Sequence, residues 1–178
     1  MGSPAPTRVL NFWGGPCSGK STVKAGTFFH LKINGARAAQ IEEYATECSF
    51  DRDFDSLSNQ RKVLEEQERR QRRMLGQVDW IVTDSPLLLS CIYSSGPYRT
   101  DAFHREVFER FDLYDNVNIW LERPDGAYQT YGRHHNEAEA REIDLQLLEL
   151  LEGRIDFRVK ADETTPQRVM EFLVKRFK

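Results

Sequence analysis

The residues with the clearest chemical signature lie near the start of the chain and form a phosphate-binding loop. Gly14, Gly19, Lys20 and Ser21 fit the fixed positions of the pattern G-x-x-x-x-G-K-[ST]. An apolar run, 9–13, leads into the loop, and a helical pattern, 21–31, follows it. Backbone N–H groups and a helix N-terminus in such a loop bind phosphate oxygens. We therefore expect the binding of a nucleotide by Gly14, Gly15, Pro16, Cys17, Ser18, Gly19, Lys20, Ser21 and Thr22.

Two side chains of this loop carry the expected catalytic and metal chemistry. Lys20 is predicted to reach the β- and γ-phosphates, where its charge stabilises the transferred phosphoryl group. The hydroxyl of Ser21 is predicted to ligate Mg²⁺. The motif thus predicts ATP and Mg²⁺ as cofactors.

Two carboxylates follow predicted strands and could complete the site. Asp84 ends the apolar segment 79–84, where it can hold the Mg²⁺ shell or simply cap the turn at Pro86. Glu43 ends the predicted strand 36–43 and can take the proton from an attacking hydroxyl. Glu42 is an alternative base, because an error of one residue in the strand exchanges the two faces. Either Glu43 or Asp84 is thus a candidate catalytic base.

A long predicted helix, 56–75, supplies candidate residues for binding the acceptor. Gln67 belongs to a row of glutamines and apolar residues at helical spacing, so its amide could read a base edge or lie at a half-exposed boundary. Arg70 belongs to the basic run 69–73, which could follow a phosphate backbone or form a solvated face.

The segment of about 123–152 is predicted to act as a lid over the site. Arg123 and Arg133 are candidates for stabilising charge on the transferred phosphoryl group, although both could be surface residues. Asn136 is predicted to cap the helix that follows, with Glu139 completing a capping box.

Predicted strands and helices alternate along the whole chain, which is typical of a parallel sheet covered on both faces. We expect a single α/β domain over 1–178, with about five strands and a flexible lead-in over 1–7. A polar loop is expected over 48–55, a helix over 101–111 and a final edge strand over 155–161. The length favours a compact P-loop kinase over a motor or an AAA-type ATPase.

Composition sets limits on the partners of the chain. It has 178 residues and a net charge of −3, so the molecule as a whole is not built for general attraction to nucleic acid. Its three cysteines lack metal-type spacing and suggest reduced thiols in a cytoplasmic setting. We expect no membrane span, because no stretch is long and apolar enough.

With these residues assembled, the chain resembles the small P-loop kinases of nucleosides, nucleotides and ribosylnicotinamide. The segments GGPCSGKST, EEYATE, TDSPLLLS and YGRHHNEAEAREID further resemble phage-encoded kinases of 5-hydroxymethyluracil in DNA. That resemblance implies transfer of the γ-phosphate of ATP to a hydroxyl of a modified pyrimidine in DNA. The alternatives are a free nucleoside or nucleotide as acceptor, and a nucleotide-binding switch or ATPase. Asp84-Ser85-Pro86 replaces the Asp/Glu-Arg-Ser motif of deoxynucleoside kinases, and the N-K-x-D motif of GTP switches is missing.

Overall fold

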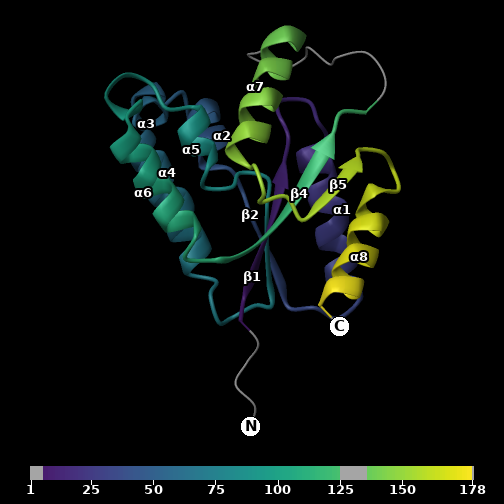
Figure 1. Ribbon diagram of the computed structural model, residues 1–178. Coiled ribbons are helices and arrows are strands. Elements are labelled where there is room, and N and C mark those ends of the chain that lie inside the picture. The colour runs from purple at the N-terminus through teal and green to yellow at the C-terminus, as the bar shows by residue number, and fades with distance from the viewer. Residues whose placement is uncertain (1–5, 125–135, 178) are drawn as a thin grey trace.

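The computed structural model describes residues 6–124 and 136–177, and it is built around one sheet of five parallel strands. The strand order is β2-β3-β1-β4-β5, so the first strand lies at the centre (Figure 1). This arrangement confirms the predicted fold class. The strands are β1 Arg8–Trp13, β2 Ala38–Ile41, β3 Trp80–Thr83, β4 Asp115–Glu122 and β5 Phe157–Lys160.

Helices cover both faces of the sheet. The α1 and α8 helices lie together on one face, and α4 to α7 lie on the other (Figure 1). Each face has its own apolar core, one with Val23 and Val169 from α1 and α8, the other with Leu64 and Leu147 from α4 and α7. The helices are α1 Lys20–Ile33, α2 Tyr44–Asp51, α3 Phe54–Ser58, α4 Gln60–Arg72, α5 Leu89–Ile92, α6 Asp101–Phe111, α7 Glu137–Leu150 and α8 Thr165–Arg176.

Buried strands and capped helices follow the sequence closely in several places. Residues 9–13 of β1 are all buried, as a parallel strand between two helical layers requires. The helix expected over 101–111 is α6, and the final strand is β5 at the edge of the sheet. Asn136 and Glu139 form the predicted capping box of α7, with N–H to oxygen distances of 3.0 and 2.8 Å. These local predictions are confirmed.

The region between β2 and β3 differs from the prediction. The expected loop over 48–55 contains the end of α2 and the start of α3, and the expected helix over 56–75 is two helices, α3 and α4. Asp53 accepts from the N–H of Ser56 at 3.0 Å, and Asn59 accepts from the N–H of Lys62 at 3.1 Å. These short polar side chains are therefore N-caps, which start new helices where the pattern suggested a loop and a continuous helix.

One strand boundary also changes. The strand predicted over 36–43 ends at Ile41, which leaves both Glu42 and Glu43 beyond it. Thr7, the last residue of the predicted lead-in, is buried. Its hydroxyl donates to the carbonyl of Val78 at 2.6 Å and accepts from the N–H of Gly76 at 2.9 Å.

Candidate active site

The phosphate-binding loop joins β1 to α1 and ends at the N-terminus of that helix. Gly14 has φ +142° and Gly19 has φ +88°, conformations that favour glycine, so the spacing of the motif has a backbone reason. Residues 17–22 line a small cavity of about 70 Å³ at the helix N-terminus. The exposed N–H groups and the helix dipole there fit a phosphate group.

A second, larger cavity adjoins the loop. Its volume is about 850 Å³, and it lies beyond the carboxyl ends of β1, β2 and β3, where open parallel sheets bind ligands. Lys20 and Ser21 line both cavities, so the two adjoin at these residues. The Nζ of Lys20 donates to the carbonyls of Gly14 and Gly15 at 2.7 and 2.9 Å.

Both predicted carboxylates lie at the wall of the larger cavity. Asp84 follows β3, and Glu43 is the residue before α2, where its Oε2 accepts from the hydroxyl of Thr46 at 2.6 Å. Burial, together with the charge of Glu43, raises the pKa of Tyr93 to about 12, even though Tyr93 is 40% exposed as a whole residue. The cavity thus combines two carboxylates with a neutral phenol, and the roles of base and metal ligand remain predictions.

Lys24 is a buried member of the site that the sequence analysis missed. Ile41 pairs with Thr83 in the sheet, so Glu42 and Asp84 leave β2 and β3 side by side. The Nζ of Lys24 lies 2.9 Å from Oδ1 of Asp84 and 3.2 Å from Oε2 of Glu42. Glu42 therefore belongs to an ion-pair cluster with Asp84, whereas Glu43 lines the cavity.

The protonation of Lys24 follows from these neighbours. Burial alone would lower its pKa, but the charge of Asp84 and hydrogen bonds to Asp84 and Glu42 raise it overall. The side chain therefore stays a cation between two carboxylates. A usable signal in the sequence was its spacing, because a residue four positions after Lys20 lies on the same face of the helix.

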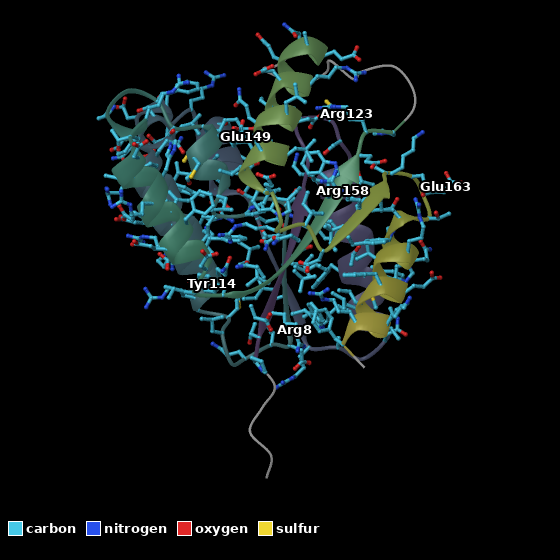
Figure 2. The ribbon with its side chains drawn as sticks, in the orientation of Figure 1. Arg8, Tyr114, Arg123, Glu149, Arg158 and Glu163 are labelled. Atoms are coloured by element: carbon cyan, nitrogen blue, oxygen red, sulfur yellow. The ribbon has the colours of Figure 1, made fainter. Side chains whose placement is uncertain are left out.

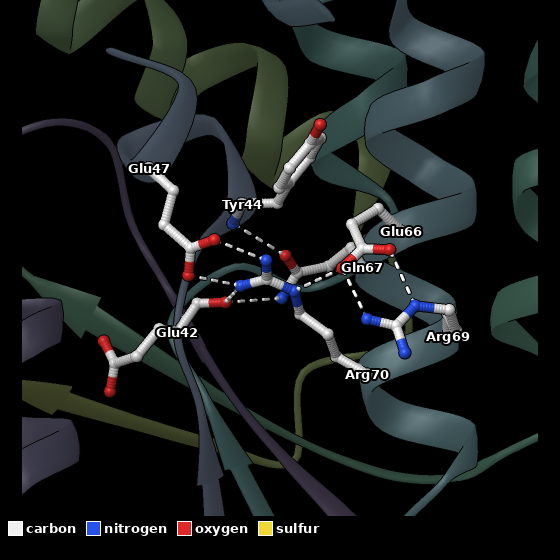
Figure 3. Close-up of polar contacts among 7 residues, drawn as sticks. All are labelled: Glu42, Tyr44, Glu47, Glu66, Gln67, Arg69 and Arg70. Carbon is white, nitrogen blue, oxygen red and sulfur yellow. Dashed lines mark hydrogen bonds and ion pairs between the residues drawn. The ribbon is translucent and has the colours of Figure 1, made fainter. Parts of the chain in front are cut away.

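Gln67 and Arg70 brace the turn from β2 to α2 (Figure 3). The Oε1 of Gln67 accepts from the N–H of Tyr44 at 3.0 Å, and its Nε2 donates to the carbonyl of Glu42 at 3.4 Å. The guanidinium of Arg70 donates to Glu47 at 2.6 and 2.5 Å and to Glu66 at 3.0 Å.

This bracing gives both candidate acceptor residues a structural role. Gln67 lines the larger cavity, and its amide makes one accepted and one donated hydrogen bond to backbone groups, so reading of a base edge by its remaining N–H and lone pair stays a prediction. Arg69 and Arg70 are paired with Glu47 and Glu66 in a network within the protein, whereas Arg72 and Arg73 of the same basic run are exposed, and contact of this run with a phosphate backbone stays a prediction. Hydrogen bonds from Arg69 and then Arg70 outweigh burial and lower the pKa of Glu66 to about 2.

Arg123 ties α7 to the phosphate-binding loop at the end of β4 (Figure 2). Its Nε lies 2.5 Å from Oδ2 of Asp144, and its two terminal nitrogens donate to the carbonyls of Pro16 at 2.5 Å and Ala140 at 2.8 Å. Asp144 in turn accepts from the N–H of Gly15 at 2.6 Å. We call this set the Arg123–Asp144 latch.

The latch changes the interpretation of the predicted lid. Three of the five N–H donors of Arg123 bond protein groups, and a role of the remaining two on the transferred phosphoryl group stays a prediction. Arg133 lies outside the described residues. The α7 part of the predicted lid packs its buried residues Ala140, Ile143 and Leu147 into the fold.

The geometry fits a nucleotide site, and comparison with a protein family agrees. Residues 9–167 match the profile of a family described as an AAA domain. The chain belongs to this family. The family carries the description of an AAA domain, while the fold is the compact P-loop kinase-like one that the length favoured. Comparison with curated protein sequences finds no match.

Solved structures with a similar fold include small kinases. The APS kinase CysC of Mycobacterium tuberculosis, in complex with AMPPNP and APS, has a TM-score of 0.53 at 15% identity and covers 96% of this chain and 99% of its own. A shikimate kinase from Bacteroides thetaiotaomicron gives 0.51 at 14% identity, with the same coverage. NadR in complex with NR gives 0.57 at 13% identity, and the match covers 95% of this chain and half of that one. At these identities the likeness establishes the fold.

The residues present also fit Mg²⁺. Magnesium usually binds through one or two carboxylates together with substrate phosphates and waters, and Ser21 and Asp84 line the same cavity beside the phosphate cradle. Within residues 6–124 and 136–177, no group of three or more His, Cys, Asp or Glu residues could hold a metal by itself. In the same ranges no helix is long and apolar enough to cross a membrane.

Proposed function

We propose that the protein is an ATP-dependent kinase that phosphorylates a hydroxyl of a small molecule. The observation that supports this most is that Lys20 and Ser21 line both cavities, which places the two next to each other. A donor phosphate in the small cavity would then lie beside an acceptor in the large one, which has Glu43 and Asp84 in its wall. Such an arrangement favours transfer between two bound molecules over a switch, which needs no second cavity.

The residues of this chain would act mainly by positioning and electrostatics. The loop binds and orients the phosphates, and Lys20 offsets charge on the transferred group. Glu43 accepts the hydroxyl proton as the acceptor oxygen bonds to the γ-phosphorus, and the bond from that phosphorus to ADP breaks. Mg²⁺, held through Ser21 and Asp84, supplies further charge neutralisation when bound.

Two acceptor classes follow from the sequence resemblance. A free nucleoside or nucleotide is favoured because similar folds include an APS kinase and a shikimate kinase, and because Arg69 and Arg70 are engaged within the protein. 5-Hydroxymethyluracil in DNA stays the alternative, supported by the four motif segments. It would also require the target base to leave the stack, at a cost of roughly a few kcal/mol.

The test is transfer of label from γ-labelled ATP in the presence of Mg²⁺. The acceptors are free nucleosides, nucleotides, and matched DNAs that contain thymine or 5-hydroxymethyluracil. We expect label on a small molecule, and a loss of roughly 10²-fold or more in kcat for folded Lys20→Ala. Label on modified DNA alone would establish the alternative. Slow ATP hydrolysis with no labelled acceptor would overturn the kinase proposal.

A further inference from the structure

We infer that the acceptor is an uncharged molecule with a flat ring and a hydroxyl, of which a free nucleoside is the natural example. This inference rests on the proposed function and narrows it. It concerns the larger cavity, whose wall combines two carboxylates with aromatic side chains.

The negative charges of this wall would repel an acceptor that carries a phosphate group. Among the described residues that line the cavity, Lys20 is the one cation, and it belongs to the donor loop. The other charged residues are Glu43 and Asp84. Proteins bind phosphate with arginine, lysine or a helix N-terminus. The N-terminus of α1 serves the donor, and the N-terminus of α2, which also borders the cavity, carries the carboxylate of Glu43. A phosphate on the acceptor would therefore face carboxylates.

Arg70 does not correct this imbalance. It is not among the residues that line the cavity, and Glu47 and Glu66 hold its guanidinium on α4. Bringing it to an acceptor phosphate would leave both carboxylates without this partner. An uncharged acceptor needs no such exchange.

Part of the cavity wall is aromatic. Phe50 at the end of α2 and Phe54 at the start of α3 line it although they are 84% and 62% exposed. Tyr93 adds a third ring and, with its pKa at about 12, is uncharged at neutral pH. Exposed phenylalanines beside a cavity offer faces on which a flat ring can stack. The hydroxyls of Ser49 and Ser58 and the amide of Gln60 each donate to a backbone carbonyl, which leaves their oxygens able to accept from ring substituents.

The experiment compares kcat/KM for a nucleoside with that for the same nucleoside carrying a 3′-phosphate. We expect the 3′-phosphate to lower kcat/KM by roughly tenfold or more, the scale of a like-charge interaction at about 10 Å in a protein environment. Equal or better use of the 3′-phosphate, or of modified DNA, would overturn the inference while leaving the kinase function intact. Absence of label on every acceptor would instead overturn the function itself.

Variants test the ring and the charge separately. Phe54→Ala should raise KM for the nucleoside by roughly tenfold, as expected for the loss of one stacking contact, without changing KM for ATP. Leu113→Ala is the matched control. Leu113 is also exposed, at 77%, but it precedes β4 and therefore lies at the amino ends of the strands, away from the cavity at their carboxyl ends. Ser58→Arg adds a cation at an exposed position of the wall and should reduce the discrimination against the 3′-phosphate. Unchanged KM in Phe54→Ala, or equal turnover of alcohols without a ring, would overturn the ring recognition.

Discussion

Replacing Lys24 by glutamine should destabilise the protein strongly, although lysine is usually a surface residue. The side chains of Lys24 and Asp84 are only 6% and 11% exposed, and their charged atoms lie 2.9 Å apart. Breaking a buried ion pair by removing one partner costs about 3–5 kcal/mol, because the remaining charge is left buried. Glu42 adds little, since its side chain is 61% exposed.

We expect the lower end of this range, about 3 kcal/mol, because Asp84 borders a cavity that water can enter. For a domain of this size the loss corresponds to a fall in Tm of roughly 6–12 °C. The pH dependence has a definite sign. The folded pKa of Lys24 is raised, so its contribution is fully present below the ordinary lysine value of 10.5 and is lost as the pH rises through the folded pKa.

The assay is a double-mutant cycle measured by denaturant unfolding at pH 7.5. Lys24→Gln and Asp84→Asn should together cost less than the sum of the two single variants, with a coupling energy of about 2 kcal/mol. Arg141→Gln is the control, because it breaks an ion pair whose side chains are 65% and 52% exposed and should leave the midpoint unchanged. Additive single effects, or a Lys24→Gln variant as stable as the native chain, would refute the reasoning.

Three other substitutions give separate tests. Glu43→Gln should lower kcat without a matching loss of ATP binding, as kinetic and equilibrium titrations can check. Gly15→Ala should cost about 1–3 kcal/mol in unfolding free energy, because its Cβ would lie 2.6 Å from Oδ1 of Asp144; unchanged stability would contradict the close contact. Glu66→Gln should lower the unfolding free energy by about 1 kcal/mol above pH 4.5, because hydrogen bonds from Arg69 lower the pKa of Glu66 to about 2. In acid denaturation the difference from the native chain should disappear as the pH falls from 4.5 through about 2.

The sequence predicted best the features that depend on local spacing. Gly14 and Gly19 of the loop have positive φ, the capping residues of α7 lie three positions apart, and residues 9–13 of β1 are buried between two helical layers. Each of these constraints acts within a few residues, so a pattern along the chain is enough to identify it.

The features that could not be predicted from the sequence depend on contacts between segments that are distant along the chain. A lysine in a helix is usually a surface residue. Lys24 is instead buried beside Glu42 and Asp84, which the pairing of β2 with β3 brings together. The position of Arg123 in the sequence suggested an arginine of a lid. In the structure its guanidinium bonds Asp144 and the carbonyl of Pro16. Neither partner set is visible before the strand order is known.

The Arg123–Asp144 latch links the position of α7 to the affinity of the protein for the nucleotide. Asp144 holds the N–H of Gly15, so α7 cannot move away without releasing a bond to the loop that binds phosphate. Movement of α7 and binding of the nucleotide are therefore linked equilibria. If one changes the equilibrium constant of the other by some factor, the reverse effect has the same factor. Whatever shifts α7 must therefore change the Kd for the nucleotide, and the nucleotide must change the affinity for whatever shifts α7.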